Sequence, residues 1–463
     1  MKNIRSCFRT NIIKKIKDTI LSPVRLTVIS FAAAIILGSL LLTLPATAKD
    51  GKATNFINAL FTATSATCVT GLTVFDTFAK WNIFGQLIIL TLIQIGGLGL
   101  ITLVVFFSMY TNRKMGIKNM QIAQEAVGFG DVIEIKSLIK LVVKVSLIIE
   151  SLGAALLAFR FIPKYNIING IYISIFLAVS AFCNAGIDII PHNGSASFSL
   201  TNYNSDPVVL PVIALLIIIG GLGFVVWYDI FLNKERSLML HTKVVLIISG
   251  TLLFLGTFVF LFLEWNNPET LGGLSFGAKI NAAFFQSATV RTAGFFSVNP
   301  SHLNNSTKLF LICLMFIGGA PGSTAGGIKV TTIAVIWKTI TCFIRGKNDT
   351  VIFNRRVHKQ VVYKSISIFG ISILATIISS IVVYITTQDI LVSGIDAVFE
   401  SVSAIGTVGI SVGISSVASK ISKLILILVM FAGRVGPVTL MLAFLRETPE
   451  NRLMLPEAKI MIG

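Results

Sequence analysis

Long apolar runs constrain this chain more than any other feature of its sequence. Several reach or approach the roughly 20 residues that an α-helix needs to cross the ~30 Å hydrocarbon core of a bilayer, and they lie at 26–44, 84–107, 208–232, 244–263, 366–385 and 424–445. Hydrophobic residues make up 54% of the 463 and charged residues only 13%, which is too little charge for the surface of a soluble protein of this length. The sequence therefore predicts an integral membrane protein.

Lysine and arginine give the chain a formal net charge of +18. That charge could suit nucleic acid, but the phenylalanines that would stack on bases lie mostly inside the apolar runs, so we expect no nucleic-acid partner. The basic residues instead gather in alternate loops and near both termini. Because cytoplasmic loops are enriched in Lys and Arg, we expect a multi-pass protein of the cell membrane with both termini in the cytoplasm. The first apolar run is longer than the core of a signal peptide, and we expect it to be retained.

An internal repeat sets the organisation of the chain. Four segments align without a gap on one glycine each, at Gly71, Gly186, Gly294 and Gly409. Phenylalanine stands ten positions before every glycine, at Phe61, Phe176, Phe284 and Phe399. Serine stands six positions before the glycine in three segments, at Ser65, Ser180 and Ser403, and the third segment has Ala288 there. Each segment lies between two apolar runs and is too short and polar to span a membrane itself, so the repeated unit is a helix, a pore loop and a second helix.

Four such units predict an all-α membrane fold of eight transmembrane helices with pseudo-fourfold symmetry around a central pore. Both ends of each unit face the cytoplasm, so the units run parallel, unlike the inverted repeats of many secondary transporters. First helices are expected at 24–45, 137–162, 243–264 and 361–386, and second helices at 83–108, 207–232, 307–343 (interrupted) and 421–446. The predicted boundaries are a cytoplasmic segment at 1–22, repeats at 23–108, 137–232, 243–343 and 361–446, and a cytoplasmic tail at 447–463.

The backbone around each repeat glycine suits cation binding. Non-helical backbone at membrane depth is tolerated only where it lines a cavity or is buried in protein. The Ser-, Thr- and Ala-rich stretch before each glycine predicts a half-helix whose C-terminal end directs partial negative charge at the pore centre. Extended residues beyond it could replace an ion's hydration shell with carbonyls, and glycine permits the backbone angles required. One such glycine would more simply mark a tight turn, but four in register favour a filter. The candidate carbonyls belong to Val69, Thr70, Gly71, Asn184, Ala185, Gly186, Thr292, Ala293, Gly294, Thr407, Val408 and Gly409.

With these segments the chain resembles the Trk/Ktr/HKT superfamily of K⁺ transporters, and it is most similar to the membrane subunit of bacterial Ktr systems. The resemblance covers essentially the whole chain, and Thr292-Ala293-Gly294-Phe295 preceded by Arg291 is among its more specific motifs. Two additional N-terminal helices of Trk-type relatives do not precede the first repeat, which favours the Ktr branch. Plant relatives that prefer Na⁺ can have serine in place of the first filter glycine, so Gly71 implies a preference for K⁺. The TVGYG sequence of K⁺ channels is absent from every unit, which implies fewer coordination sites.

The resemblance also implies partners. It implies a homodimer in which each protomer has its own pore, docked on a cytoplasmic ring of nucleotide-binding regulatory subunits of the RCK type. K⁺ is the expected transported ion, and whether Na⁺ stimulates uptake stays open. The chain has no nucleotide site of its own, so we expect ATP or ADP to act only through the partner. Basic loops at 109–136 and 344–360 are the expected docking surfaces.

The predicted second helix of repeat three breaks at 318–327, where five glycines and one proline occur in ten residues. The spacing of Gly322 and Gly327 fits a phosphate-binding loop, but Ile328 follows instead of lysine. The alternatives are a flexible packing hinge and a mobile constriction below the filter, and the resemblance implies that this loop obstructs the pore. The expected gating residues are Gly318, Gly319, Gly322, Gly326 and Gly327, together with Arg434.

Arg434 lies inside the predicted second helix of repeat four and needs a partner, because a charge near mid-membrane costs about 2.5–3.5 kcal/mol on insertion scales; Arg291 lies three residues before Gly294. The resemblance implies that Arg434 contacts the gating loop, and a structural ion pair is the alternative. Arg291 would repel a cation if it faced the pore, so we expect it to turn away and brace the filter, with Glu400 as one candidate partner. Cys68 and Cys183, in the same register, are expected to pack rather than bind metal.

Other functions fit the sequence less well. The pore subunit of a K⁺-pumping ATPase complex shares this repeat but usually carries extra helices. A membrane enzyme would need clustered ionisable residues around a cavity, whereas Glu150, Arg160 and Arg434 are scattered along the chain. A purely structural membrane scaffold would not require four matched glycines. The glycines at 96–99 and 220–223 superficially resemble a dinucleotide motif, but close helix packing explains them better.

Overall fold

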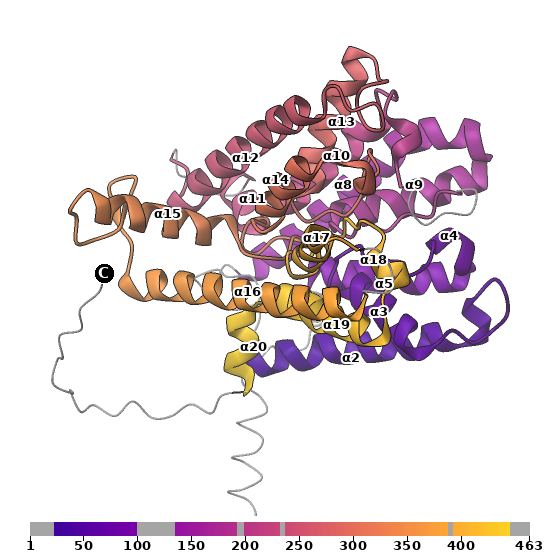
Figure 1. Cartoon of the computed structure of the whole chain (residues 1–463), viewed down its shortest axis with the longest axis horizontal. Coiled ribbons are helices and arrows are strands. Elements are labelled where there is room, and N and C mark those ends of the chain that lie inside the picture. The colour runs from indigo at the N-terminus through magenta and orange to yellow at the C-terminus, as the bar shows by residue number, and fades with distance from the viewer. Residues whose placement is uncertain (1–22, 100–134, 192–198, 232–236, 388–391, 445–463) are drawn as a thin grey trace, which may run out of the picture.

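The computed structural model describes residues 23–99, 135–191, 199–231, 237–387 and 392–444. The predicted cytoplasmic segments 1–22 and 447–463, and the larger part of loop 109–136, lie outside these ranges. Helices dominate the described chain, and the four predicted first helices are all present (Figure 1). They are α2 (Pro23–Thr43), α8 (Ile135–Tyr165), α12 (Leu240–Glu264) and α16 (Lys359–Thr386). Each is long and apolar enough to cross a membrane.

Each first helix is followed by a shorter pore helix that ends just before the repeat glycine. The pore helices are α3 (Phe56–Thr67), α9 (Ile167–Phe182), α13 (Phe276–Thr289) and α17 (Gly394–Ile405). Side-chain caps start two of them: the Asn55 carbonyl oxygen accepts from the Ile57 N–H, and the Ser393 hydroxyl oxygen accepts from the Asp396 N–H. Every pore helix packs against the first helix of its own repeat.

The second helices are interrupted in more repeats than the sequence predicted. In repeat three, α14 (Asn305–Met315) and α15 (Val330–Ile344) are separated by the irregular segment that the sequence predicted. Repeat two also breaks, where α10 (Val209–Gly221) meets α11 (Phe224–Phe231) at 90°. Repeat four breaks where α19 (Lys420–Val435) meets α20 (Pro437–Phe444) at 96°. The prediction of continuous helices there is wrong.

Glycine and proline account for the unexpected breaks. Gly223 and Gly436 have φ of +96° and +95°, a left-handed conformation that a right-handed helix cannot continue through. Pro437 follows Gly436 and has no N–H to bond the preceding turn. In repeat one, α5 (Ile83–Leu98) ends at Gly99, whose φ is +83°. Among the residues that the structure describes, four helices are thus long and apolar enough to span a membrane, or up to six if each bent pair is one span, so the count of eight stays a prediction.

The remaining elements are short connections. They are η1 (Pro45–Thr47), α4 (Thr77–Lys80), η2 (Thr201–Tyr203), η3 (Pro300–His302), α18 (Ile414–Val417), and the strands β1 (Val351–Ile352) and β2 (Arg355–Arg356). The two strands pair antiparallel, with Val351 opposite Arg356, and form a basic hairpin between α15 and α16.

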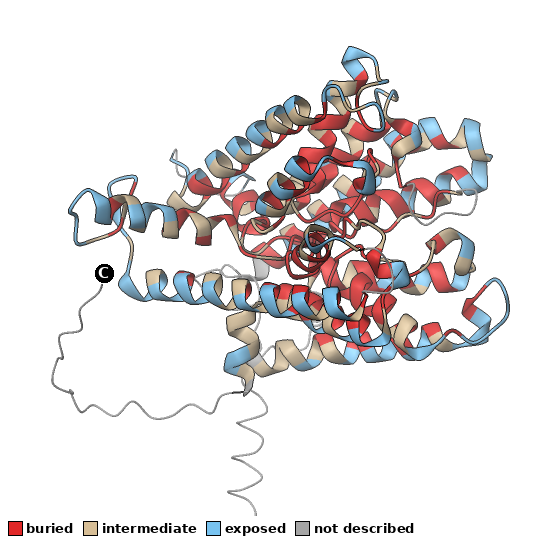
Figure 2. Cartoon of the chain, viewed as in Figure 1, coloured by how far each residue is buried: buried red, intermediate tan, exposed pale blue. Residues whose placement is uncertain are grey.

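Burial separates the inner helices from the outer ones (Figure 2). Nearly all residues in the last turns of the four pore helices are buried. By contrast, only 28–33% of the residues in the most apolar stretch of each long first helix are buried. Many exposed residues of these outer helices are large and apolar: Phe254, Phe258 and Phe262 of α12 are 72%, 61% and 76% exposed. An apolar outer surface of this kind matches lipid tails rather than water.

The repeats contact one another in a closed order. The pore helices α9, α13 and α17 pack against the second helices of the preceding repeats, which are α5, α10 and α14. The pore helix of the first repeat, α3, packs against α19 of the fourth. The chain therefore returns to its start, and the ends of the four pore helices lie inside the resulting ring of helices.

Candidate functional site

The four repeat glycines lie against one another at the ends of the pore helices. A Cβ atom added to any of them would meet the carbonyl oxygen that precedes another of these glycines. The added Cβ would lie 2.7 Å from the Ala185 oxygen at Gly71 and 3.0 Å from the Val408 oxygen at Gly294. At Gly186 it would meet the Ala293 oxygen, and at Gly409 the Thr70 oxygen. These contacts run from repeat one through two, three and four and back to one. The sequence-predicted filter residues are thus brought together, and no side chain fits at the glycine positions.

The residue two positions before each glycine has a left-handed backbone. Its φ is +55° at Val69, +60° at Asn184, +72° at Thr292 and +50° at Thr407. Positive φ is uncommon for residues with a side chain, and for β-branched valine and threonine it is an outlier. Strained conformations of this kind concentrate at functional sites. In each segment a left-handed residue is followed by one with negative φ and then by the glycine with positive φ, so none of these segments is a regular strand.

The shared serine in three repeats holds the predicted filter segment to its pore helix. The Ser65 hydroxyl accepts the Gly71 N–H at 3.0 Å, and the Ser403 hydroxyl accepts the Gly409 N–H at the same distance. Ser180 instead bonds both backbone groups of Ile187, at 3.1 and 2.7 Å. The third repeat lacks this serine, and the Thr289 hydroxyl donates to the Phe295 carbonyl at 2.5 Å. The serine noted in the sequence therefore fixes the turn that contains the glycine.

A cavity is lined by the four glycines. The residues two positions after them line it, at Thr73, Asp188, Phe296 and Ser411. Asp76 also lines it, and its carboxylate caps α4 by accepting from the Phe78 N–H at 2.9 Å. The Asp188 carboxylate accepts from the Ile190 N–H at 3.3 Å. Hydroxyl and carboxylate oxygens thus surround the approach to the filter segments.

Glu400 and Arg291 have different partners, so the candidate pair between them is wrong. The fully buried Glu400 carboxylate accepts from the Ser411 hydroxyl at 2.8 Å, and from the Ser415 N–H at 3.1 Å as well as the Ser415 hydroxyl. It therefore ties α17 to the loop after the fourth glycine. The Arg291 guanidinium donates to the Ser249 carbonyl at 3.1 Å and to the Ser249 hydroxyl at 2.9 Å. Arg291 thus points toward α12, where two uncharged oxygens of Ser249 accept hydrogen bonds from its guanidinium.

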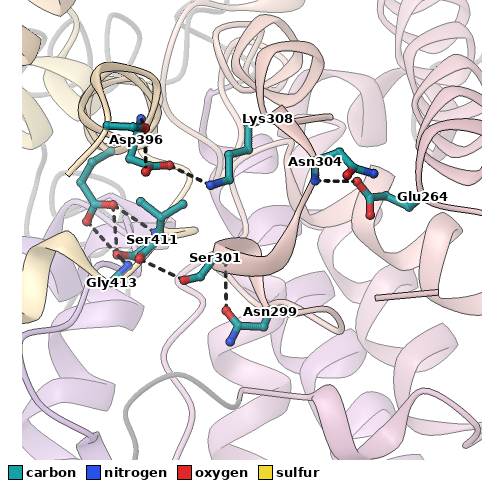
Figure 3. A network of polar contacts seen from close by, with 11 residues as sticks. Glu264, Asn299, Ser301, Asn304, Lys308, Asp396, Ser411 and Gly413 are labelled. Atoms are coloured by element: carbon teal, nitrogen blue, oxygen red, sulfur yellow. Dashed lines mark hydrogen bonds and ion pairs between the residues drawn. The ribbon is translucent and has the colours of Figure 1, made fainter. Parts of the chain in front are cut away.

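A polar network joins the outer ends of repeats three and four (Figure 3). Lys308 of α14 forms an ion pair with Asp396 of α17 at 2.8 Å. The Ser301 hydroxyl donates to the Val412 carbonyl at 3.1 Å, close to Ser411 on the cavity wall. On the other side, the Glu264 carboxylate at the end of α12 accepts from the Asn304 N–H at 3.0 Å. These contacts anchor the loops that follow the third and fourth filter segments.

The irregular segment 318–327, hereafter the intramembrane loop, packs against the breaks of two other second helices. The Ala320 N–H donates to the Gly221 carbonyl at 3.0 Å, and the Gly327 N–H donates to the Gly433 carbonyl at 3.2 Å. The Phe224 N–H, at the start of α11, donates to the Gly322 carbonyl at 2.7 Å. Its own ends are joined by the Gly318 N–H and the Ile328 carbonyl at 2.8 Å. Gly319 and Gly326 pack closely too, against Gly221 and Thr407.

Two half-buried cations hold this loop from inside the protein. The guanidinium of Arg434 donates to the Thr324 carbonyl and to the Gly96 and Gly97 carbonyls. The structure thus contains the predicted contact between Arg434 and the loop. The ammonium of Lys329 donates to the Ala325 and Gly326 carbonyls at 2.7 and 3.3 Å. Sequence reasoning missed Lys329, although an ionisable residue directly after a helix break inside an apolar span was a usable signal.

The sequence profile of the TrkH family, described as a cation transport protein, matches residues 24–455. The chain belongs to this family. It is 38% identical to the Ktr system potassium uptake protein B of Bacillus subtilis over an alignment of 453 residues. This alignment covers 97% of this chain and 99% of the relative. The chain is 36% identical to the potassium/sodium uptake protein NtpJ of Enterococcus hirae, over 98% of this chain and 100% of the relative.

A solved structure has the same fold as this TrkH-family chain. The potassium transporter TrkH from Vibrio parahaemolyticus superposes with a TM-score of 0.71 at 17% identity, over 92% of this chain and 85% of the other. The resemblance predicted from the four glycine segments is thus confirmed at the level of family and of membrane fold. Family membership also places the chain among cation transporters rather than enzymes.

Close packing explains further glycines of this TrkH-family chain. A Cβ on Gly96, Gly220 or Gly433 would meet the last carbonyl of a pore helix, at Thr67, Phe182 and Ile405 respectively. Gly97 lies against Cys183, which is fully buried, as is Cys68. Within the described ranges, no group of three or more His, Cys, Asp or Glu side chains is arranged to hold a metal ion. The predicted packing role of the glycines at 96–99 and 220–223 is confirmed at Gly96 and Gly220.

Proposed function

We propose that this chain is the K⁺-translocating membrane subunit of a Ktr-type uptake system. The closed ring of contacts among Gly71, Gly186, Gly294 and Gly409 carries this proposal. A ring of backbone carbonyls replaces the hydration shell of an ion that enters it. The names of the relatives, which are potassium and potassium/sodium uptake proteins, support K⁺ as the transported ion.

In this proposal the four repeats surround one pore with pseudo-fourfold symmetry. Supporting observations are the repeated left-handed residue two positions before each glycine and the cyclic packing of pore helices on second helices. The coordinating carbonyls belong to the filter residues named from the sequence. Arg291 and Glu400 support this filter from behind, one through Ser249 and the other through the loop at 411–415.

The intramembrane loop is the proposed gate of this pathway. Its contacts reach the helix breaks of repeats two and four, and Arg434 links it to the end of α5 in repeat one. A glycine-rich segment held by several hydrogen bonds of about 1 kcal/mol each can leave these sites at a free-energy cost of a few kcal/mol. Gly318, Gly319, Gly322, Gly326 and Gly327 are therefore the proposed moving residues, and Arg434 is the residue that retains them.

The proposed cellular setting follows from the family and from the charge pattern. Both termini lie in the cytoplasm of a cell-membrane protein, and the chain forms a homodimer on a cytoplasmic RCK-type ring. Nucleotide acts through that ring, and Na⁺ is a candidate stimulating ion. The basic hairpin of Arg355 and Arg356 lies in the proposed docking loop 344–360. The name of the Bacillus subtilis relative, which refers to a Ktr system, supports a partner.

Exchange of a single filter glycine tests the function. Gly294→Ser places a side chain at a backbone φ of +84°, 3.0 Å from the Val408 carbonyl, so the ring must widen locally. We expect K⁺/Na⁺ discrimination to fall at least threefold in the uptake of K⁺ by a K⁺-requiring strain that expresses the full chain. Unaltered competition by Na⁺, with the variant present in the membrane at the wild-type amount, would refute the filter assignment.

A further inference from the structure

One filter side chain contacts the intramembrane loop directly. Asn184, two positions before Gly186, is fully buried, and its Oδ1 accepts the hydroxyl of Thr324 at 3.0 Å. Thr324 is also fully buried and lies in the middle of the loop. The two residues are 140 positions apart in the chain, so the bond joins repeat two to repeat three. A buried hydroxyl that loses such a partner is left unsatisfied, which makes the bond costly to break.

The same amide group reaches a second filter segment. Asn184 Nδ2 donates to the Thr292 hydroxyl at 3.4 Å, and Thr292 stands at the equivalent position of repeat three. Both residues have left-handed backbones, with φ of +60° and +72°. One side chain thus spans two neighbouring filter segments and the loop. The equivalent residue of repeat one is Val69, which has no group to make these bonds.

The surroundings leave this bond little freedom. A Cβ on Gly220 would lie 2.8 Å from Thr324 Oγ1 and 2.9 Å from Asn184 Oδ1, so α10 encloses the bond from the side. The Thr324 N–H donates to the Gly220 carbonyl at 3.3 Å, and the Thr324 carbonyl accepts from the guanidinium of Arg434. Thr324 is therefore held at its hydroxyl and its amide by repeat two, and at its carbonyl by repeat four.

We propose that Asn184 is a latch: its side chain holds the intramembrane loop through Thr324 and the third filter segment through Thr292, so that loop release and filter geometry are coupled. This inference rests on the proposed function, in which the loop is the gate. Asn184 is a positioning residue in this role, distinct from the role of its backbone carbonyl in the filter. When the loop leaves, Asn184 loses one partner and is free to rearrange against Thr292.

Thr324→Val tests the latch, because it removes the hydroxyl and keeps the shape of the side chain. Thr324→Ser is the matched control, since it keeps the hydroxyl. We expect Thr324→Val to raise K⁺ flux without the regulatory partner about three- to tenfold, the effect of one lost hydrogen bond. The ratio of flux with partner to flux without it should fall by the same factor. Thr324→Ser should match wild type. Both are measured in the full chain, in K⁺-requiring cells, at equal amounts of membrane protein.

A second variant tests whether the two residues act together. Asn184→Leu removes both amide bonds, so it should raise partner-independent flux and also reduce K⁺/Na⁺ discrimination. If the latch exists, Asn184→Leu with Thr324→Val raises flux no further than the larger single change, because coupled residues are not additive. Fully additive effects would overturn the latch. If Asn184→Leu does not accumulate in the membrane, the comparison of Thr324→Val with Thr324→Ser decides alone.

Deletion of 318–327 separates failure of the latch from failure of the gate. Where deletion raises flux but Thr324→Val behaves as wild type, the loop is a gate and Asn184 is not its latch. Where deletion leaves flux unchanged, the gate is refuted together with the latch. The latch is supported only where deletion and Thr324→Val both raise flux and Thr324→Ser does not.

Discussion

The proposed filter ring and the intramembrane loop lie in contact but are built in opposite ways, one by four similar segments and the other by a single segment. Four copies of one backbone pattern build the ring, with a left-handed residue, an ordinary residue and a glycine in each. The loop occurs in the third repeat, and its contacts with two other repeats differ from each other: a backbone bond to Gly221 of repeat two, and a backbone bond to Gly433 together with the Arg434 side chain in repeat four. Coordination of an ion on a pore axis is favoured by similar ligands on all sides, whereas a single segment is enough to block a pore.

The largest effect should come from a change that breaks the ring. Gly71→Ala adds a Cβ only 2.7 Å from the Ala185 carbonyl and at a φ of +98°, which alanine rarely adopts. Strain of this kind costs about 1–3 kcal/mol before the clash is counted. We expect K⁺ uptake to fall at least tenfold in K⁺-requiring cells.

Gly277→Ala is the matched control for that experiment. Gly277 lies in the pore helix α13, and a Cβ there would meet nothing within 4 Å. Alanine should be neutral or slightly stabilising in such a helix. Equal uptake by both variants would mean that the glycines do not form the constriction.

Removal of the loop should have the opposite sign. Deletion of 318–327 removes the backbone bonds to Gly221 and Gly433 and one of the three acceptors of Arg434, the Thr324 carbonyl. We expect partner-independent K⁺ flux to rise about tenfold or more, because several hydrogen bonds of about 1 kcal/mol each favour the blocked state. K⁺/Na⁺ discrimination should stay within twofold of wild type, since the ring itself is retained. Flux at the wild-type level would contradict a gate at this position.

The sequence predicts the symmetric region better than the asymmetric one. The first helices were predicted to within a few residues, for example 243–264 against Leu240–Glu264, because an apolar period and length are local properties. The glycine positions were predicted because the repeat supplies four independent copies. The breaks at Gly223 and Gly436 were missed, since a glycine in an apolar run fits close packing and a helix end equally well.

Long-range partners could not be predicted from local pattern. Arg291 bonds Ser249, 42 positions earlier, and Glu400 bonds the loop that follows its own filter segment. Both sets of partners depend on which helices pack against each other in the folded protein, and the local sequence does not give that information. The left-handed backbone at Val69 also has no local signal, because valine disfavours it. Such conformations are imposed by the packing of the four repeats.

A smaller effect should come from the serine that fixes the filter turn. Ser65→Ala removes the acceptor of the Gly71 N–H and leaves that buried donor unpaired, at a cost of about 1–3 kcal/mol. We expect K⁺/Na⁺ discrimination to fall about threefold with little change in the amount of protein. Ser146→Ala is the control, because the buried Ser146 hydroxyl donates to the Val142 carbonyl of its own helix. A similar change in both variants would assign the loss to helix stability rather than to the filter.

The smallest effect tests where the symmetry of the ring ends. Outside the glycines the four repeats place Thr73, Asp188, Phe296 and Ser411 on the cavity wall, so repeat two contributes a carboxylate there. One unit charge acting through water over several ångströms is worth about 0.5–1 kcal/mol, or a two- to fivefold change in local cation concentration. Asp188→Asn should therefore raise the K⁺ concentration for half-maximal uptake about twofold at low ionic strength. The effect should disappear near 1 M salt, where the screening length is about 3 Å. Asp50→Asn is the control, because its carboxylate is paired with Lys80 and does not line the cavity. It should leave the K⁺ concentration for half-maximal uptake unchanged at both low and high salt. A shift that persists at high salt would mean that Asp188 binds the ion directly instead of attracting it through space.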